Sequence, residues 1–394
     1  MTEQQTTPEL RFPEFKDNWK PIKLETLLQE TNIKQNQNTP LFSLTVENGL
    51  IEKIDRYNRE FLVKKADAFK NVKPLNIVYN PMNITLGAID LLSINKEVKV
   101  SGYYNVLEIK DQTNPKFLIE TLKTYKSILL YKKVATGSLK EKQRVHFSEF
   151  KKLHKLFPSY TEQKKIGNFF SKLDRQIELE EEKLELFEEQ KKGYMQKLFS
   201  QEVRFKDDKG NNYPDWQRVK IGDILEERTE RSSEGDMLSV TINNGIIKFD
   251  EVDRKDNSSK DKSNYRKVYK NDIAYNSMRM WQGASGKSAY EGIVSPAYTV
   301  TVPIESINPD FIAYYFKTHK MIHKFKINSQ GLTSDTWNLK YKQLKEIKIN
   351  LCLKEEQNKI ANLLITFDKL ISRQQNKIEI LKTNKKGLLQ KMFI

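Results

Sequence analysis

An internal duplication limits the folds that are open to this chain of 394 residues. The matched segments, given as first copy and second copy, are 19–24 and 216–221, 43–51 and 239–247, 77–82 and 273–278, and 100–104 and 294–298. From about Val100 to Phe199 the register needs no gap, and the second copy lies 194 residues further on. Solenoid repeats are only about 20–50 residues long. The chain is therefore a duplicated module, with its boundary near Ser200.

The first part of each module has the pattern of short strands separated by turns. Residues 42–46 alternate in polarity before Asn48-Gly49, a dipeptide typical of hairpin turns, and residues 298–302 alternate likewise. A short helix is expected after each Asn-Pro, over 117–124 and 311–318. This mixture predicts an α+β or mixed α/β globule, and periodicity alone does not fix its topology.

The second part of each module has the period of a long helix. Apolar residues at alternating spacings of four and three form the a/d pattern of a coiled coil. They are Ile166, Phe170, Leu173, Ile177, Leu184 and Phe187 in the first helix, and Ile360, Leu364, Phe367, Ile371, Ile378 and Leu381 in the second. The two polar interruptions of each seam, Glu180 and Lys191 or Gln374 and Lys385, fall at matching positions. One such helix would be expected to lie on a globule, but two matched seams predict helices that pair with each other.

The charges of the two helices are complementary, which favours pairing within one chain. Glutamates crowd 178–189 of the first helix, whereas lysines and an arginine recur over 369–386 of the second. Flanking charges commonly choose partners in coiled coils. We therefore divide the chain into a first globule at 1–160, a helix at 161–200, a second globule at 201–353 and a helix at 354–394, with the two long helices antiparallel.

The composition indicates a polyanionic partner. The chain has 68 Lys and Arg against 52 Asp and Glu, a formal net charge of +16. A charge this positive is typical of proteins that bind nucleic acid or an acidic membrane surface, although it could also serve solubility alone. Cys352 is the only cysteine, which excludes an intrachain disulfide. With neither a signal peptide nor a membrane-spanning run evident, we expect a cytoplasmic protein with no membrane partner.

Several motifs, taken in order along the chain, resemble those of one family. They are Trp216 before a strand, Ser295-Pro296-Ala297-Tyr298, Glu-Gln-x-x-Ile at the start of each long helix, and the helix endings 192–199 and 386–393. With the order globule, helix, globule, helix, the whole chain resembles the specificity subunits of type I restriction–modification enzymes. The first copy departs from the family at 102–104, where Gly-Tyr-Tyr stands in place of Pro-Ala-Tyr.

This resemblance implies both a function and a set of partners. Each globule would be a target-recognition domain that reads one half of a bipartite site in double-stranded DNA. The helix pair would be a spacer that fixes the unread gap and docks two DNA-methyltransferase subunits. Restriction subunits would join the full complex, and adenine methylation and cleavage would be performed by these partners.

We find no catalytic constellation, and we expect no catalytic residue, metal or cofactor. Residues 281–288 end like a phosphate-binding loop, but Trp281 stands where that motif requires its first glycine. Asn80-Pro81-Met82-Asn83 only faintly resembles an adenine-methylase loop. His319 and His323 could share a metal in principle, but solvated helix residues are the simpler interpretation. A basic, duplicated chain without such a site indicates a binding protein.

Side chains that read DNA are expected in loops between strands, where Arg, Lys, Asn or Gln can reach base edges. In the second globule the candidates are Arg254, Arg266, Arg279, Trp281, Gln282, Lys287, Thr333, Ser334 and Asn338. In the first globule they are Arg56, Arg59, Asn83, Thr85, Ser138, Lys140, Lys142, Gln143 and Arg144. For any one of them, a solvated surface residue is the alternative.

Three other functions stay open. A free-standing DNA-binding protein or anti-restriction decoy would need no methyltransferase. A nuclease would need a site that the sequence does not display, and a coiled-coil scaffold would not need two large basic globules.

Overall fold

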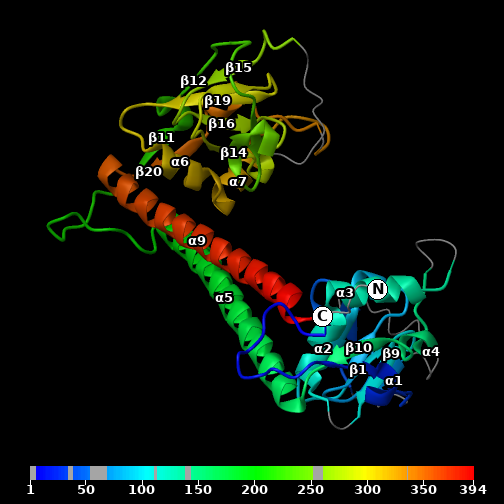
Figure 1. The fold of residues 1–394 in the computed structure, drawn as a ribbon. Coiled ribbons are helices and arrows are strands. Elements are labelled where there is room, and N and C mark those ends of the chain that lie inside the picture. The colour runs from blue at the N-terminus through cyan, green and yellow to red at the C-terminus, as the bar shows by residue number, and fades with distance from the viewer. Residues whose placement is uncertain are drawn as a thin grey trace. The chain divides into compact units, whose positions relative to one another are not determined.

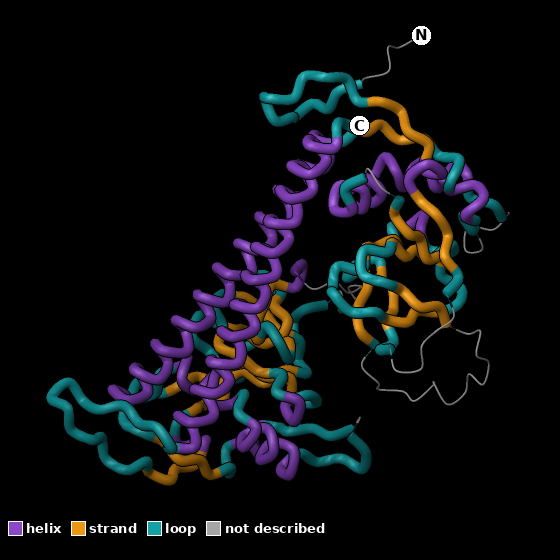
Figure 2. Tube along the Cα trace, turned by 90° about the horizontal axis from the view of Figure 1, so that it is seen from below, coloured by secondary structure: helices purple, strands orange, loops and turns teal. Residues whose placement is uncertain are grey.

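The computed structural model describes residues 6–33, 39–53, 69–110, 113–137, 143–251, 261–334 and 336–394. The chain forms two compact units: unit 1 is Met1–Glu182 with Asn376–Ile394, and unit 2 is Lys183–Gln375 (Figure 1). Each unit contains one globule and parts of both long helices, coloured by secondary structure in Figure 2. No helix in the described ranges is long and apolar enough to cross a membrane.

The globule of unit 1 is built on a four-stranded antiparallel sheet in the order β2-β9-β6-β7. Its strands are β2 (Leu28–Thr31), β9 (Asn105–Ile109), β6 (Ile77–Tyr79) and β7 (Ile89–Leu91). Two-stranded pairs surround it: β1 (Lys20–Lys23) with β10 (His154–Phe157), β3 (Phe42–Thr45) with β4 (Gly49–Glu52), and β5 (Phe69–Val72) with β8 (Val98–Ser101). Its helices are α1 (Leu24–Leu27), η3 (Ile84–Leu86), α2 (Pro115–Lys123), α3 (Tyr125–Val134) and α4 (Phe147–Phe150).

The globule of unit 2 repeats this sheet topology strand by strand. Its sheet order is β12 (Leu225–Glu227), β19 (Tyr298–Pro303), β16 (Ile273–Asn276) and β17 (Ser285–Lys287). The pairs are β11 (Gln217–Lys220) with β20 (Lys348–Leu351), β13 (Leu238–Thr241) with β14 (Gly245–Lys248), and β15 (Arg266–Val268) with β18 (Gly292–Val294). The helices are η5 (Ile221–Asp223), η6 (Phe249–Glu251), η7 (Met280–Gln282), α6 (Pro309–Phe316), α7 (His319–Asn328) and α8 (Tyr341–Leu344). The duplication in the sequence is therefore a duplication of the fold, and the predicted mixed α+β globules are confirmed.

The helices expected after each Asn-Pro begin two residues earlier than predicted, at Pro115 and Pro309. Asn114 caps the first helix, since its side chain accepts a hydrogen bond from the Phe117 amide at 3.1 Å. Asn308 caps the second in the same way. Proline is favoured at the first helical position because its missing amide hydrogen is not needed there.

The long helices, α5 (Tyr160–Ser200) and α9 (Lys354–Met392), each contribute to both units. In unit 1 the start of α5 runs antiparallel to the end of α9. Three ion pairs join them: Asp174 with Lys385 at 2.6 Å, Glu180 with Lys377 at 2.5 Å, and Glu181 with Lys382 at 2.6 Å. Exposed pairs are worth only about 0.2–1 kcal/mol each, so they select the register more than they stabilise it.

In unit 2 the end of α5 runs antiparallel to the start of α9. Lys191 of α5 forms an ion pair with Asp368 of α9 at 2.5 Å, and the rings of Tyr194 and Phe367 lie 5.5 Å apart. Lys191 and Lys385 are thus both paired with an aspartate of the other helix. These polar interruptions of the seam therefore lie at the same structural position in the two modules.

All twelve apolar residues predicted to line the helix seam are buried or half-buried. The outermost of them also belong to the globules. Ile166 and Phe170 join the core of unit 1, and Ile360 and Leu364 join the core of unit 2. Heptad spacing does not distinguish these two environments, because both require an apolar helix face.

The end of each long helix completes a core that begins elsewhere in the chain. In unit 1, Phe393 stacks on Phe117 with the ring centroids 5.4 Å apart, and it also touches Trp19. In unit 2, Phe199 stacks on Tyr315 at 4.8 Å. Met392 lies buried beside Phe393 in the first core. The core of the first globule is thus closed by the last residues of the second module.

Two buried glutamates explain the Glu-Gln motif that opens each long helix. Glu162 receives two hydrogen bonds from the Arg11 guanidinium, both at 2.7 Å, and Glu356 is bound by Arg204 at 3.1 and 2.8 Å. The glutamine that follows, Gln163, accepts a hydrogen bond from the Asn114 amide at 3.1 Å. The motif therefore joins the helix start to an incoming segment and to the cap of a second helix.

Candidate nucleic-acid interface

Each globule carries the same tight turn between its two paired strands, β6 and β7 in unit 1 and β16 and β17 in unit 2. We call residues 80–87 the η3 turn and residues 276–283 the η7 turn, after the short helix in each. Asn80 and Asn276 open them, each with a side-chain oxygen that accepts a hydrogen bond from the amide two residues on, at 3.0 Å. Gly87 and Gly283 close them with φ of 106° and 87°, in the left-handed region that favours glycine.

A second loop is joined to each turn. In unit 2, Gln330 and Asn338 pair as an antiparallel bridge, and the Leu339 amide donates to the Ser277 carbonyl at 2.8 Å. In unit 1, Thr136 pairs with Arg144, and a 3.0 Å bond from Val145 to Pro81 makes the same connection. Of the DNA-reading candidates, Arg279 and Asn338 in unit 2 and Asn83 and Arg144 in unit 1 therefore belong to joined loops, although the members of each pair lie 59 and 61 residues apart in the sequence.

Two tryptophans connect the loops of unit 2. The rings of Trp281 and Trp337 lie 5.2 Å apart at 77°, edge to face. The Trp281 indole also donates a hydrogen bond to the Met278 carbonyl at 3.1 Å. The ammonium of Lys326, on α7, lies 5.7 Å from the centre of the Trp337 ring. Trp281 is thus a half-buried packing residue that stiffens the turn.

The remaining candidates of unit 2 differ in availability. Arg279 is exposed, as are Thr333 and Ser334, whereas Gln282 and Asn338 are half-buried. By contrast, Lys287 forms an ion pair with Asp310 at 2.7 Å, and Arg266 forms one with Glu227 at 2.8 Å. The charges of Lys287 and Arg266 are therefore largely neutralised inside the globule.

In unit 1, Asn83 and Arg144 are exposed and Gln143 is half-buried. Thr85 is buried, at the position that Trp281 occupies in the η7 turn. The candidates Arg56, Arg59, Ser138, Lys140, Lys142 and Arg254 lie outside the described residues.

Few of the described arginines are free to contact DNA. The structure describes ten of them, and five are paired with carboxylates: Arg11, Arg175, Arg204, Arg228 and Arg266. Arg231 bonds to Asn264. Four have no ion pair or side-chain hydrogen bond with another described residue: Arg144, Arg218, Arg279 and Arg373. Two of these four, Arg144 and Arg279, belong to the paired loops.

A half-buried lysine supports the η7 turn. The Lys317 ammonium donates to the carbonyls of Gly283 and Ile242, each at 2.6 Å, and burial lowers its pKa to about 8. The corresponding residue of unit 1, Lys123, instead forms an ion pair with Asp90 at 2.5 Å. Gly286 stands in the place of Asp90, which leaves Lys317 bound to carbonyl groups.

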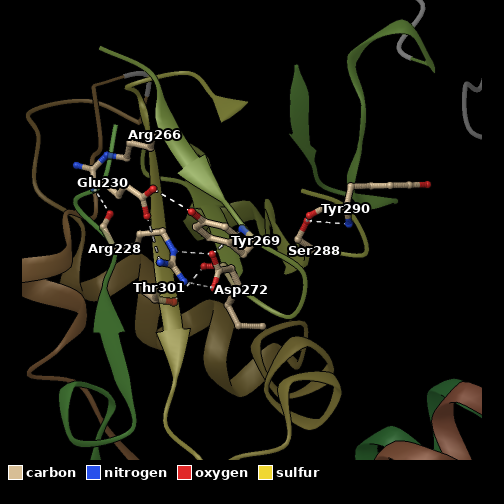
Figure 3. A network of polar contacts seen from close by, with 9 residues as sticks. Arg228, Glu230, Arg266, Tyr269, Asp272, Ser288, Tyr290 and Thr301 are labelled. Atoms are coloured by element: carbon tan, nitrogen blue, oxygen red, sulfur yellow. Dashed lines mark hydrogen bonds and ion pairs between the residues drawn. The ribbon is translucent and has the colours of Figure 1, made fainter. Parts of the chain in front are cut away.

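A network of polar contacts between strands, which the sequence did not reveal, supports unit 2 (Figure 3). Arg228 donates to both carboxylate oxygens of Asp272, at 2.8 and 3.0 Å, and lies over the ring of Tyr269. The hydrogen bond to Asp272 raises the pKa of Arg228. Tyr269 in turn donates to Glu230 at 2.9 Å. These contacts join residues up to 44 positions apart, and no local pattern predicts them.

Replacing Arg228 with alanine is expected to destabilise unit 2. The Asp272 side chain is only 4% exposed, so the substitution leaves a buried carboxylate without its partner. Loss of one member of such a pair costs on the order of 3 kcal/mol. Urea unfolding followed by tryptophan fluorescence measures the effect, with Arg231→Ala, an exposed arginine of the same unit, as the control. A change below about 1 kcal/mol would contradict this role of the network.

The described residues offer little for catalysis. They contain no group of three or more His, Cys, Asp or Glu side chains that could hold a metal ion. His319 and His323 are exposed on α7. Cys352 is buried, and this burial raises the pKa of its thiol, which disfavours a reactive thiolate at neutral pH. The paired loops instead present amide, hydroxyl and guanidinium groups that suit recognition.

Comparison with known proteins matches part of the chain to a family. Residues 213–382 match the family model described as "Type I restriction modification DNA specificity domain". Two specificity subunits of Methanocaldococcus jannaschii are similar: that of the type I restriction enzyme MjaVIII is 29% identical over 50% of this chain, and that of MjaIX is 36% identical over 24%. These alignments cover 46% and 21% of the relatives' own lengths, so the chain matches less than half of each.

Solved structures extend the likeness to the whole chain. The S subunit of a type I restriction–modification system from M. genitalium aligns over 98% of this chain and 99% of its own, with a TM-score of 0.57 and 15% identity. A structure described as showing complex assembly and conformational transition of the type I R-M system aligns over 95% and 97%, with a TM-score of 0.52 and 14% identity. At such low identity these likenesses support the fold alone.

Residues 213–382, which lie mostly in unit 2, thus match a type I restriction–modification DNA specificity domain. The resemblance of the repeated motifs to the specificity subunits of type I restriction–modification systems is confirmed by these matches.

Proposed function

We propose that this chain is the non-catalytic subunit that recognises a bipartite target in double-stranded DNA, one half-site for each globule. The observation that carries the proposal is the repetition of one exposed construction, a turn joined to a second loop, in both globules. Two similar surfaces with different side chains suit two different short sequences. The net charge of +16 supplies the attraction to phosphates.

The division into globules at 1–160 and 201–353 and helices at 161–200 and 354–394 belongs to the same proposal. The helix pair spaces the two half-sites and docks two DNA-methyltransferase subunits, and restriction subunits complete the assembly. Adenine methylation and DNA cleavage take place on these partners, in the cytoplasm.

Expression of the chain with the methyltransferase subunit of its host system tests this function. The two proteins are expected to copurify, and methylation-sensitive sequencing of the host genome should reveal two short sequences separated by a gap of fixed length. A decoy would instead bind DNA without retaining a methyltransferase. The pure chain should leave DNA intact in the presence of Mg²⁺, whereas a nuclease would cleave it.

The spacer role predicts a change in the gap when the helices are lengthened. One heptad is inserted into α5 after Glu182 and one into α9 after Gln375, where the chain passes between the two units. Each helix grows by about 10.5 Å, which corresponds to roughly 3 base pairs at about 3.4 Å each. Both half-sites should remain and the gap should widen by that amount in the sequenced methylome.

A heptad added to α5 alone provides the control. It lengthens the stretch of α5 between Glu180 and Lys191, so that these two residues can no longer both contact their partners in α9, Lys377 and Asp368. In that variant the two methylated half-sites should no longer be separated by one fixed number of base pairs. An unchanged gap in the double insertion would show that something other than the helices sets the spacing.

A further inference from the structure

The η3 and η7 turns share a backbone but differ in one exposed side chain. Asn83 and Arg279 occupy the residue before the short helix, with φ and ψ of −118° and 4° in the first turn and −126° and 11° in the second. Both side chains are exposed and make no hydrogen bond or ion pair with another described residue. The same position therefore presents an amide in one globule and a guanidinium in the other.

We propose that this position reads a base in each half-site, adenine through Asn83 and guanine through Arg279. This inference rests on the proposed function. Asparagine can bind the N6 and N7 atoms of adenine with two hydrogen bonds, and arginine can bind O6 and N7 of guanine in the same bidentate way. The two half-sites then differ at the position contacted by the equivalent residue.

The other members of the η3 turn are poorly suited to distinguish bases. Ile84 and Thr85 are buried, and the exposed side chains of Met82 and Leu86 are apolar. Asn80 is half-buried, and its side-chain oxygen accepts the hydrogen bond from the Met82 amide, so that this side chain lacks the free acceptor that a two-bond contact with adenine needs. Within this described turn, Asn83 is thus the exposed side chain that is free to form hydrogen bonds.

The backbone of this position is held on both sides. The amide of Arg279 donates to the Asn276 carbonyl at 3.0 Å, and its own carbonyl accepts a hydrogen bond from Ala284 at 3.2 Å. Asn83 has the same two bonds, with Asn80 at 3.0 Å and Ala88 at 3.1 Å. A backbone fixed before binding reduces the entropy lost when the side chain contacts DNA. It also favours the defined geometry that a bidentate contact needs.

Among the cationic candidates of unit 2 that the structure describes, Arg279 is the one without a carboxylate partner. Lys287 and Arg266 already have carboxylate partners at 2.7 and 2.8 Å, and binding to DNA would require these ion pairs to be broken. Arg279 needs no such exchange. It also lies beside the Trp281 and Trp337 contact, which stiffens the two loops around it.

The experiment uses the complete chain with its methyltransferase and compares the methylated sites of variants in the host genome. Arg279→Gln should relax or replace a guanine in one half-site only, and binding to oligonucleotides with that base changed should lose roughly 10- to 100-fold discrimination. Asn83→Arg should change an adenine, toward guanine, in the other half-site only. Retention of the untouched half-site shows that each variant is folded and assembled.

Arg279→Lys distinguishes base reading from a phosphate contact. Lysine keeps the positive charge but lacks the planar pair of donors, so base discrimination should fall while salt-dependent affinity is retained. Arg218→Gln, at an exposed and equally unpaired arginine of β11, is the matched control and should leave both half-sites unchanged.

An unaltered guanine preference in both Arg279 variants would overturn the inference while the bipartite site persisted. A wild-type complex that methylates no bipartite site would instead contradict the proposed function.

Discussion

Replacement of Phe393 by alanine is expected to destabilise unit 1, although this residue lies at the far end of the chain from the globule that it supports. Phe393 is 3% exposed and packs on Phe117, Trp19 and Phe170. A buried phenylalanine replaced by alanine loses its transfer free energy and leaves a cavity, together about 3–5 kcal/mol. That is a large fraction of the roughly 5–15 kcal/mol that stabilises a typical domain.

The tryptophans make this loss measurable in each unit separately. Trp19 is the only tryptophan of unit 1, whereas Trp216, Trp281 and Trp337 belong to unit 2. In a variant that keeps Trp19 alone, the urea midpoint should fall with Phe393→Ala and change little with Phe199→Ala. The reverse is expected when Trp216 is the remaining fluorophore, because Phe199 packs on it. A loss below about 1 kcal/mol would show that the helix end does not complete the first core.

DNA affinity of the assembled complex is expected to fall steeply with salt. If about 6–10 phosphates are neutralised, the affinity should drop by roughly 10³–10⁵ between 50 and 200 mM salt, because bound counterions are released on binding. Fluorescence anisotropy with a labelled duplex measures the slope. A nearly salt-independent affinity would contradict recognition of DNA by this subunit.

The structure also predicts which lysines contribute to the salt dependence of DNA affinity. Lys326 is exposed beside the paired loops, so Lys326→Gln should reduce the slope by about 1. Lys287→Gln is the matched control, because Lys287 is already paired with Asp310. Equal reductions from both substitutions would show that internal ion pairs do not exclude a lysine from the interface.

The elements that can be predicted well from the sequence are those whose residue pattern extends over many turns or is repeated in both modules. The matched seams of α5 and α9 extend over many turns, and the repeated motifs fix the two modules independently of any contact. The order of short strands in each sheet could not be obtained in the same way. For example, β2 pairs with β9, which lies much further along the sequence, and such pairing depends on contacts that no local pattern reveals.

In the candidate site, too, residue types can be predicted from the sequence, but contacts between distant residues cannot. The loop positions of Arg279 and Asn338 could be chosen from residue type, but the bond from Leu339 to Ser277 that unites them could not. The neutralisation of Lys287 by Asp310 was equally hidden, since the two residues lie 23 positions apart. The role shared by Arg11 and Arg204 is not evident from the repeat, because the segments between each arginine and the next matched residue, the tryptophan, differ in length.

The packing of Phe393 into the first globule also sets an order for biosynthesis. Unit 2 is continuous in the sequence, whereas unit 1 needs residues 376–394 as well as 1–182. At about 5–20 residues per second, the ribosome needs roughly 10–40 s to pass from the end of the first segment to the last residues. The globule that emerges first is therefore the last to be completed. Until then its unfinished apolar surface is exposed to chaperones and to neighbouring nascent chains.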